Sequence, residues 1–174
     1  MSRMFYSLDN VIDNSDVLKA SSFFFNNPNL HGTTYGDNKI IYFHWDVNSN
    51  IFPECFRRVR RKIIELHSLQ DHFSCKGTDD FLICIEEGHE LPKHVDIIKN
   101  VLESDYQHTR ANWILSTSEN GGFIYAEEQK YIPKVNNILL LDAKKNHGVT
   151  TVKGKTPLMI YSFGFIKRCV THVL

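Results

Sequence analysis

The sequence predicts a mostly β protein, a double-stranded β-helix (jelly roll) with flanking N-terminal helices on its outside. From Phe81 onward, short apolar segments alternate with turn residues, a spacing typical of an antiparallel sandwich or barrel. The part before Phe81 has instead the pattern of mixed helix and loop. With 174 residues and 42% hydrophobic content, the chain has the size and core material of one domain. We therefore expect a single domain, 1–174, with a helical and loop part (1–80) packing on a jelly-roll core (81–174).

Two helices and one strand are expected before the jelly roll. Asn14 or Ser15 is a suitable cap for a short helix running toward Ala20, and the segment 39–45 (KIIYFHW) has the β-branched and aromatic density of a strand. A second helix should begin at Pro53, because apolar residues then recur at three- and four-residue steps: Phe52, Cys55, Phe56, Val59, Ile63 and Leu66. Its other face is basic, with Arg57, Arg58, Arg60, Arg61 and Lys62. We expect that face to be solvated rather than to bind nucleic acid.

The expected jelly-roll strands are short and follow one another closely. They are 81–85 (FLICI), 112–117 (NWILST), 123–125 (FIY), 138–141 (ILLL) and 157–165 (PLMIYSFGF). Turn-forming residues at 119–122 (ENGG) and 136–137 (NN) separate several of them.

Composition narrows the range of functions and locations. Lys plus Arg and Asp plus Glu number 20 each, so no net charge directs the chain to nucleic acid or to an anionic membrane. The four cysteines form no CxxC pair, which favours reduced thiols in a cytoplasmic protein. The N-terminus lacks the apolar segment of a signal peptide, and no apolar run reaches transmembrane length.

Three polar residues within this β-rich part form a candidate metal site. His94 and Asp96 are two residues apart, so an extended backbone points both to one face, and His147 follows a later apolar strand. Two imidazoles and one carboxylate make the facial triad that holds non-haem Fe(II) and leaves coordination positions open. A second copy of the pattern, His44-Trp45-Asp46, precedes a helix and has no comparable strand and histidine after it. We interpret that copy as structural.

Lys155 is a candidate for an anion-binding residue near this metal site. It stands just before the strand that follows His147, where a cation could pair with a ligand carboxylate deep in a barrel. The alternative is that Lys153 and Lys155 are ordinary turn lysines. A phosphate-binding loop is excluded at Gly154-Lys155-Thr156, because the upstream glycine and the strand-loop-helix context are missing.

The order of these elements resembles the Fe(II)/2-oxoglutarate-dependent dioxygenases, and within them the prolyl-4-hydroxylase-like branch. The resemblance covers roughly 81–165 and rests on the order of several motifs: His94-Val95-Asp96, the strand led by Arg110, Gly121-Gly122, the segment 133–141, His147-Gly148-Val149, and Lys155 before LMIYSF. It implies that His94, Asp96 and His147 are the iron ligands and that Lys155 pairs with the distal carboxylate of 2-oxoglutarate. Many relatives carry Arg a residue or so further along instead.

The resemblance also implies roles for three residues on one strand. Arg110 matches a position that borders the substrate opening, although it could equally be an ordinary strand-end arginine. No tyrosine matches the one that often contacts the cosubstrate, so Thr117 or Trp113 is expected to replace it. The segment 96–107, together with the first forty residues, is expected to form the lid over the site.

The expected activity is hydroxylation of an amino-acid-like small molecule or of a peptide side chain such as proline. The reaction would use Fe(II), 2-oxoglutarate and O2 and release succinate and CO2. Neither nucleic acid nor a membrane is expected as a partner, and the protein would be a monomer or a homodimer. Two other hypotheses stay open: a non-catalytic jelly-roll binding or structural module, and a cupin-type metal enzyme that does not use 2-oxoglutarate. Convergence of the three ligands, and the direction of Lys155, would separate the three.

Overall fold

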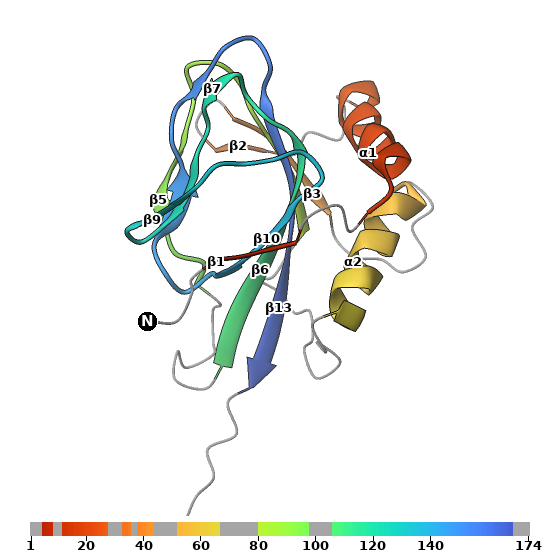
Figure 1. Cartoon of the computed structure of the whole chain (residues 1–174), viewed down its shortest axis with the longest axis vertical. Helices are drawn as coiled ribbons and strands as arrows, with labels where there is room; N and C mark the ends of the chain where they lie inside the picture. The colour runs from red at the N-terminus through yellow and green to blue at the C-terminus, as the bar shows by residue number, and fades with distance from the viewer. Residues whose placement is uncertain are drawn as a thin grey trace, which may run out of the picture.

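The computed structural model confirms a mostly β fold with two helices (Figure 1). It describes residues 5–8, 12–27, 33–35, 38–43, 52–66, 80–97 and 106–168. Figure 1 shows both helices together on one side of the long central strands and the smaller sheet on the other side. The predicted copy His44-Trp45-Asp46 lies outside the described residues, as do residues 98–105 of the predicted lid.

A large antiparallel sheet forms the centre of the molecule. It has seven strands in the order β1 (Phe5–Leu8), β10 (Ile138–Asp142), β6 (Tyr106–Ser116), β13 (Leu158–Arg168), β4 (Asp80–Ile85), β3 (Asn38–Phe43) and β2 (Thr33–Tyr35). The N-terminal part therefore contributes strands to the central sheet as well as helices. The predicted strand at 112–117 is longer than expected, because pairing with β13 continues back to Tyr106.

Two smaller sheets complete the barrel. One has four strands in the order β5 (Leu91–His94), β11 (His147–Val149), β8 (Ile124–Ala126) and β9 (Gln129–Tyr131). The other pairs β12 (Val152–Lys153) with β7 (Asn120–Gly121). Gly121 closes this turn at φ +71°, and a Cβ there would lie 2.1 Å from the carbonyl oxygen of Thr151. Only glycine fits so close a backbone contact at this φ.

Alternation along β6 and β13 separates two cores. Odd-numbered residues of both strands face the helices and join one apolar cluster, which includes Ala111, Trp113, Leu115, Met159, Tyr161, Phe163 and Phe165. Even-numbered residues face the smaller sheet, where Ile114, Leu158 and Ile160 join a second cluster. This is the two-residue period of a strand with both faces covered.

The helices α1 (Asn14–Asn26) and α2 (Glu54–Leu66) pack on the first cluster. The cap of α1 is Asp13, one residue before the predicted one, and its carboxylate accepts a hydrogen bond from the Ser15 backbone N–H at 2.7 Å. The helix continues beyond the predicted end at Ala20 because Phe23 and Phe24 are buried one turn later. The predicted apolar face of α2 is confirmed by the buried residues Cys55, Phe56, Val59 and Ile63.

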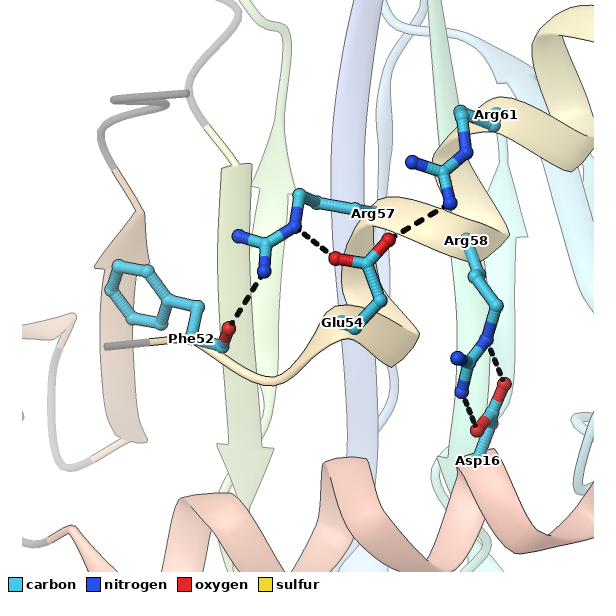
Figure 2. Close-up of polar contacts among 6 residues, drawn as sticks. All are labelled: Asp16, Phe52, Glu54, Arg57, Arg58 and Arg61. Atoms are coloured by element: carbon cyan, nitrogen blue, oxygen red, sulfur yellow. Dashed lines mark hydrogen bonds and ion pairs between the residues drawn. The ribbon is translucent and has the colours of Figure 1, made fainter. Parts of the chain in front are cut away.

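The basic face of α2 is largely bound within the molecule (Figure 2). Arg58 donates to Asp16 of α1 from two nitrogens, the Nε–Oδ2 distance being 2.9 Å. Glu54 accepts from Arg57 and, at 2.8 Å, from Arg61. The Arg58–Asp16 pair joins the two helices, and the two Glu54 pairs lie within α2 and neutralise part of its positive charge.

Arg60 points away from this face and into the sheet. Its Nη1 donates to both carboxylate oxygens of Asp80, at 2.9 and 3.2 Å, and the Tyr161 hydroxyl donates to Asp80 at 2.8 Å. Asp80 is fully buried, and burial raises its pKa to about 6 against the opposing charge of Arg60. Arg60 also stacks over the rings of Phe163 and Phe165. This buried ion pair fixes α2 to β4 and β13.

We expect Asp80→Ala to lower the free energy of unfolding by about 3 to 5 kcal/mol, because it removes the fully buried carboxylate that neutralises the largely enclosed Arg60 and accepts from Tyr161. Glu54→Ala is the matched control, since its ion pairs are exposed and should cost less than about 1 kcal/mol. Urea unfolding of both variants measures the difference. Equal losses would contradict a dominant role for the buried pair.

Candidate metal centre

His94, Asp96 and His147 converge on one point. In the antiparallel pairing of β5 with β11, His94 lies directly opposite His147, and their ring centroids are 4.4 Å apart. Asp96 follows the end of β5, where its backbone N–H donates to the carbonyl of Ala143 at 2.9 Å. One carboxylate oxygen, Oδ1, lies 3.7 Å from Nε2 of His94 and 3.9 Å from Nε2 of His147. The candidate ligand atoms all lie within 4.8 Å of one another.

Backbone carbonyls orient both imidazole rings. Nδ1 of His94 lies 2.8 Å from the carbonyl oxygen of Pro92, and Nδ1 of His147 lies 2.8 Å from that of Lys145. A carbonyl oxygen can only accept, so each Nδ1 carries the proton. In the neutral ring Nε2 then holds a lone pair, and both Nε2 atoms face Asp96. This is the arrangement in which a metal-bound histidine is held by its second nitrogen.

Arg110 of β6 holds the third ligand. Its Nε donates to Oδ2 of Asp96 at 2.6 Å, which leaves Oδ1 on the side of the histidines. Burial of Asp96 opposes ionisation, but the charge of Arg110 and the hydrogen bond that Arg110 donates lower the pKa of Asp96. The carboxylate is therefore anionic and oriented. Burial, the largest effect, lowers the pKa of His147, which keeps this ring neutral and able to bind a metal.

A cavity of about 340 Å³ opens beside these three residues. Its walls are mainly apolar, from both sheets, and its described lining residues are Phe81, Ile83, Leu91, His94, Val95, Asp96, Arg110, Asn112, Ile124, Leu141, His147, Gly148, Val149, Ile160 and Ser162. The cavity lies between the large sheet and the four-stranded sheet, and its size is that of a site for a small ligand.

The structure does not bring the predicted cosubstrate residues to this cavity. Lys155 is exposed in the turn that follows β12, and the turn ends before the chain reaches the barrel interior at Leu158. Trp113 is fully buried on the helix side of β6, where its indole N–H donates to Asn136 at 3.2 Å. Thr117 lines a separate hollow with Ser118 and Asn120. The cosubstrate role expected of these three residues therefore loses its geometric basis.

Arg110 does line the cavity, but in a position that the sequence did not indicate. It is buried in the cavity wall against Asp96 rather than at an opening. Asn112 and Ser162 also line the cavity and were not identified from the sequence. The available signal was the two-residue step from Arg110 to Asn112 in a strand otherwise rich in apolar residues.

Comparison with known proteins gives a match in structure only. No family model matches the chain, and no curated sequence matches it. Solved structures match over nearly the whole chain. A viral collagen prolyl hydroxylase from Paramecium bursaria Chlorella virus-1, in complex with 2-oxoglutarate, is 13% identical with a TM-score of 0.67, covering 98% of both chains.

Two further structures have the same fold. A prolyl hydroxylase from Trichoplax adhaerens, in complex with a hypoxia inducible factor peptide, is 16% identical with a TM-score of 0.63 over 93% of this chain and 84% of that chain. HygX from Streptomyces hygroscopicus, with nickel, 2-oxoglutarate and hygromycin B bound, is 14% identical with a TM-score of 0.66 over 94% and 83%. The chain has the jelly-roll fold of these proteins, and the predicted fold class is confirmed.

Gly148 follows His147 in β11 and lies close to residues of both neighbouring strands, so we expect Gly148→Ala to disturb the site. A Cβ at this position would lie 2.5 Å from the Tyr125 hydroxyl and 2.6 Å from the Leu91 carbonyl oxygen, so β11 would move away from β5. We expect a loss of about 1 to 3 kcal/mol in unfolding free energy and weaker metal binding than in the wild type. Calorimetric titration with Mn²⁺ and urea unfolding measure both. Unchanged metal affinity would contradict a tight β5–β11 contact.

The buried side chain of His108, on β6, leads to a prediction about how stability depends on pH. It is 1% exposed, neither ring nitrogen has a partner among the described residues, and burial, with the charge of Arg110, lowers its pKa to about 4. Because the folded-state pKa lies below the ordinary value of 6.5, the folded protein loses stability as the pH falls from 6.5 toward 4. We expect His108→Leu to be at least as stable at pH 7 and to lose less stability on acidification. Parallel pH profiles for both proteins would contradict this.

Proposed function

We propose that this protein is an Fe(II)- and 2-oxoglutarate-dependent dioxygenase that hydroxylates an amino-acid-like small molecule or a peptide side chain such as proline. The observation that carries the proposal is the convergence of His94, Asp96 and His147 on one point at the wall of a small cavity. The shared fold with 2-oxoglutarate-bound oxygenases supports it.

The donor set fits a divalent iron ion. Two neutral imidazoles and a carboxylate on one face leave positions open for further ligands, unlike a closed structural zinc site. Fe(II) held there with 2-oxoglutarate and O2 supplies the oxidative decarboxylation to succinate and CO2 that drives hydroxylation. The two histidines are register partners in the β5–β11 pair, so the backbone pairing sets their spacing, and Asp96 follows β5 two residues after His94.

The other cavity residues orient the ligands and exclude water. Arg110 keeps Asp96 ionised and turned toward the histidines. Apolar side chains such as Ile83, Ile124 and Ile160 surround the polar groups and lower the local dielectric, which strengthens every charge interaction within the cavity. The protein thereby orients the reacting groups and limits unproductive oxidation.

We also propose where a substrate would contact the protein and where the protein is located. Val95 and Ile97, beside the ligand pair, are exposed apolar residues next to the site and could contact a substrate side chain. We propose a cytoplasmic protein, monomeric or homodimeric, with neither nucleic acid nor membrane as a partner. Among the described residues, no helix combines the length and the apolar character needed to cross a membrane.

We expect His94→Ala and His147→Ala each to abolish stoichiometric Fe(II) binding and 2-oxoglutarate turnover, because two ligands no longer hold the ion. Anaerobic metal titration and succinate release in the presence of Fe(II), ascorbate and 2-oxoglutarate measure the two effects. Glu128→Ala, at an exposed turn, is the control and should behave as the wild type.

The two remaining hypotheses predict different results for the wild-type protein. Metal binding without succinate release would favour a cupin-type enzyme that does not use 2-oxoglutarate. No metal binding at all would favour a non-catalytic module. Unchanged iron binding in either histidine variant would overturn the ligand assignment.

A further inference from the structure

One short turn makes backbone contacts with two of the three candidate metal ligands. The segment 142–146, here called the ligand turn, joins β10 of the large sheet to β11 of the four-stranded sheet. The carbonyl oxygen of Ala143 accepts from the Asp96 backbone N–H at 2.9 Å. The carbonyl oxygen of Lys145 lies 2.8 Å from Nδ1 of the His147 ring. The position of Asp96 and the orientation of the His147 ring therefore both depend on the shape of this turn.

Asp142 sets the shape of the ligand turn from within. The backbone N–H of Lys145 donates to the Asp142 carbonyl oxygen at 3.1 Å, which closes a four-residue turn. The Asp142 carboxylate accepts from the backbone N–H of Lys144 at 3.0 Å. Asp and Asn are favoured in turns because their side-chain oxygen can accept from the backbone two residues on. Asp142 is exposed, so this contact and not packing in a core accounts for the position of its carboxylate.

Lys144 attaches the ligand turn to the large sheet. Its Nζ donates to the Tyr106 carbonyl oxygen at 3.1 Å and lies 4.7 Å from the centre of the Tyr106 ring. Tyr106 is 2% exposed, and a cation is held more strongly over an aromatic ring where water is partly excluded. On the same strand, the His108 carbonyl oxygen accepts from the Ala143 backbone N–H at 2.9 Å. The ligand turn is therefore attached to β6 at two alternate residues.

The other end of the ligand turn is bound to the four-stranded sheet. The backbone N–H of Glu127 donates to the Asn146 carbonyl oxygen at 2.6 Å, directly before β11 begins. The side chains of Lys145 and Glu127 form an exposed ion pair with an N–O distance of 3.9 Å, a kind of pair that contributes little. Lys145 thus acts on the site through its backbone carbonyl, whereas Asp142 and Lys144 act through their side chains.

His94 offers a comparison within the same site. Its Nδ1 lies 2.8 Å from the carbonyl oxygen of Pro92, which belongs to β5 and not to the ligand turn. A change in the ligand turn should therefore affect the ring of His147 and leave the ring of His94 in place.

We propose that Asp142 and Lys144 are positioning residues of the metal centre: they hold the ligand turn in the shape that fixes Asp96 and the His147 ring together. The inference rests on the proposed function in one respect, since it takes His94, Asp96 and His147 as metal ligands. Neither Asp142 nor Lys144 is among the described residues that line the cavity. Both therefore act through the turn and not on a substrate.

An ordinary surface turn accounts for less of what is observed. Its lysines would extend into solvent, as the side chain of Lys145 does with 48% of its surface exposed. Lys144 instead lies over a buried ring and donates to the backbone of β6. The two carbonyls that the ligand turn directs at Asp96 and His147 belong to Ala143 and Lys145, the residues on either side of Lys144.

The test follows the two positioned groups in the full chain without metal. ¹⁵N NMR of the imidazole rings shows which ring nitrogen carries the proton, at about pH 8, above the ordinary histidine pKa of about 6.5. Hydrogen exchange of the Asp96 backbone N–H reports on its bond to Ala143. The backbone N–H of Val152, which donates to the His89 carbonyl oxygen at 2.9 Å, is the control amide. Calorimetric titration with Mn²⁺ then measures the metal affinity.

The variants separate the contacts of the ligand turn. Asp142→Ala removes the acceptor inside the turn, and Asp142→Asn keeps an oxygen in its place. Lys144→Met removes the charge and the donor but keeps an unbranched side chain beside the Tyr106 ring. Lys153→Met is the matched control, because Lys153 is exposed on β12. Thermal unfolding confirms that each variant is folded.

We expect His94 and His147 of the wild-type protein each to carry the proton on Nδ1. In Asp142→Ala and Lys144→Met, the His147 ring should show both tautomers while the His94 ring keeps one. The Asp96 amide should exchange faster in these two variants, and the Val152 amide should not change. Mn²⁺ binding should weaken about tenfold, as is typical when a metal ligand loses an outer contact. Asp142→Asn and Lys153→Met should resemble the wild type.

Several results would overturn the inference. If both rings change, or if the Val152 amide also exchanges faster, the substitutions loosen the barrel as a whole. Weaker Mn²⁺ binding with an unchanged His147 ring and Asp96 amide would show that the turn does not act through these ligands. Asp142→Asn that is as damaging as Asp142→Ala would refute the role of the acceptor. Wild-type protein that binds no metal would refute the proposed function, while the ring and amide signals would still decide this inference.

Discussion

The two-residue alternation of β6 and β13 is the constraint on which both halves of this structure depend. These strands are paired in one register from Ile160 opposite Ile114 to Arg168 opposite Tyr106, so neighbouring residues along this ladder point to opposite faces of the sheet. Trp113 and Tyr161 thereby pack toward the helices, while Asn112 and Ser162 face the cavity. A shift of one residue in this ladder would turn Asn112 and Ser162 toward the helices and turn the aromatic side chains toward the cavity. Fold and site are therefore specified by the same register.

The candidate metal centre is linked to this register by the ion pair between Arg110 and Asp96. Arg110 is placed by β6 and Asp96 by the end of β5, so their contact joins the large sheet to the four-stranded sheet. The pair favours the ionised form of a partly buried carboxylate, and two backbone carbonyls fix the imidazole tautomers at the same time. The three candidate ligands are thus oriented by the fold itself.

Local sequence pattern was enough to predict that His94, Asp96 and His147 converge, whereas the positions of the other predicted residues depend on long-range geometry. The spacing of His94 and Asp96 and the strand before His147 are properties of short segments, and the structure brings these three residues together. Lys155 failed as a cavity residue because its direction depends on a turn that ends on the barrel surface. The inward direction of Arg60 and the pairing of Asn112 with Ser162 both depend on partners far away in the sequence. No window of neighbouring residues contains that information.

Each face of the large sheet carries one ion pair, and the surroundings of the two ion pairs differ. On the helix side, Asp80 is fully buried and bound by Arg60 and Tyr161, and Arg60 stacks over the rings of Phe163 and Phe165. On the cavity side, Asp96 and Arg110 are paired but border open volume. An ion pair beside a cavity retains an electrostatic field that a ligand can use, whereas an enclosed pair only holds the chain together. The two ion pairs lie on opposite faces of the large sheet. Tyr161, an odd-numbered residue of β13, contacts Asp80 on the helix side, and Arg110, an even-numbered residue of β6, contacts Asp96 on the cavity side.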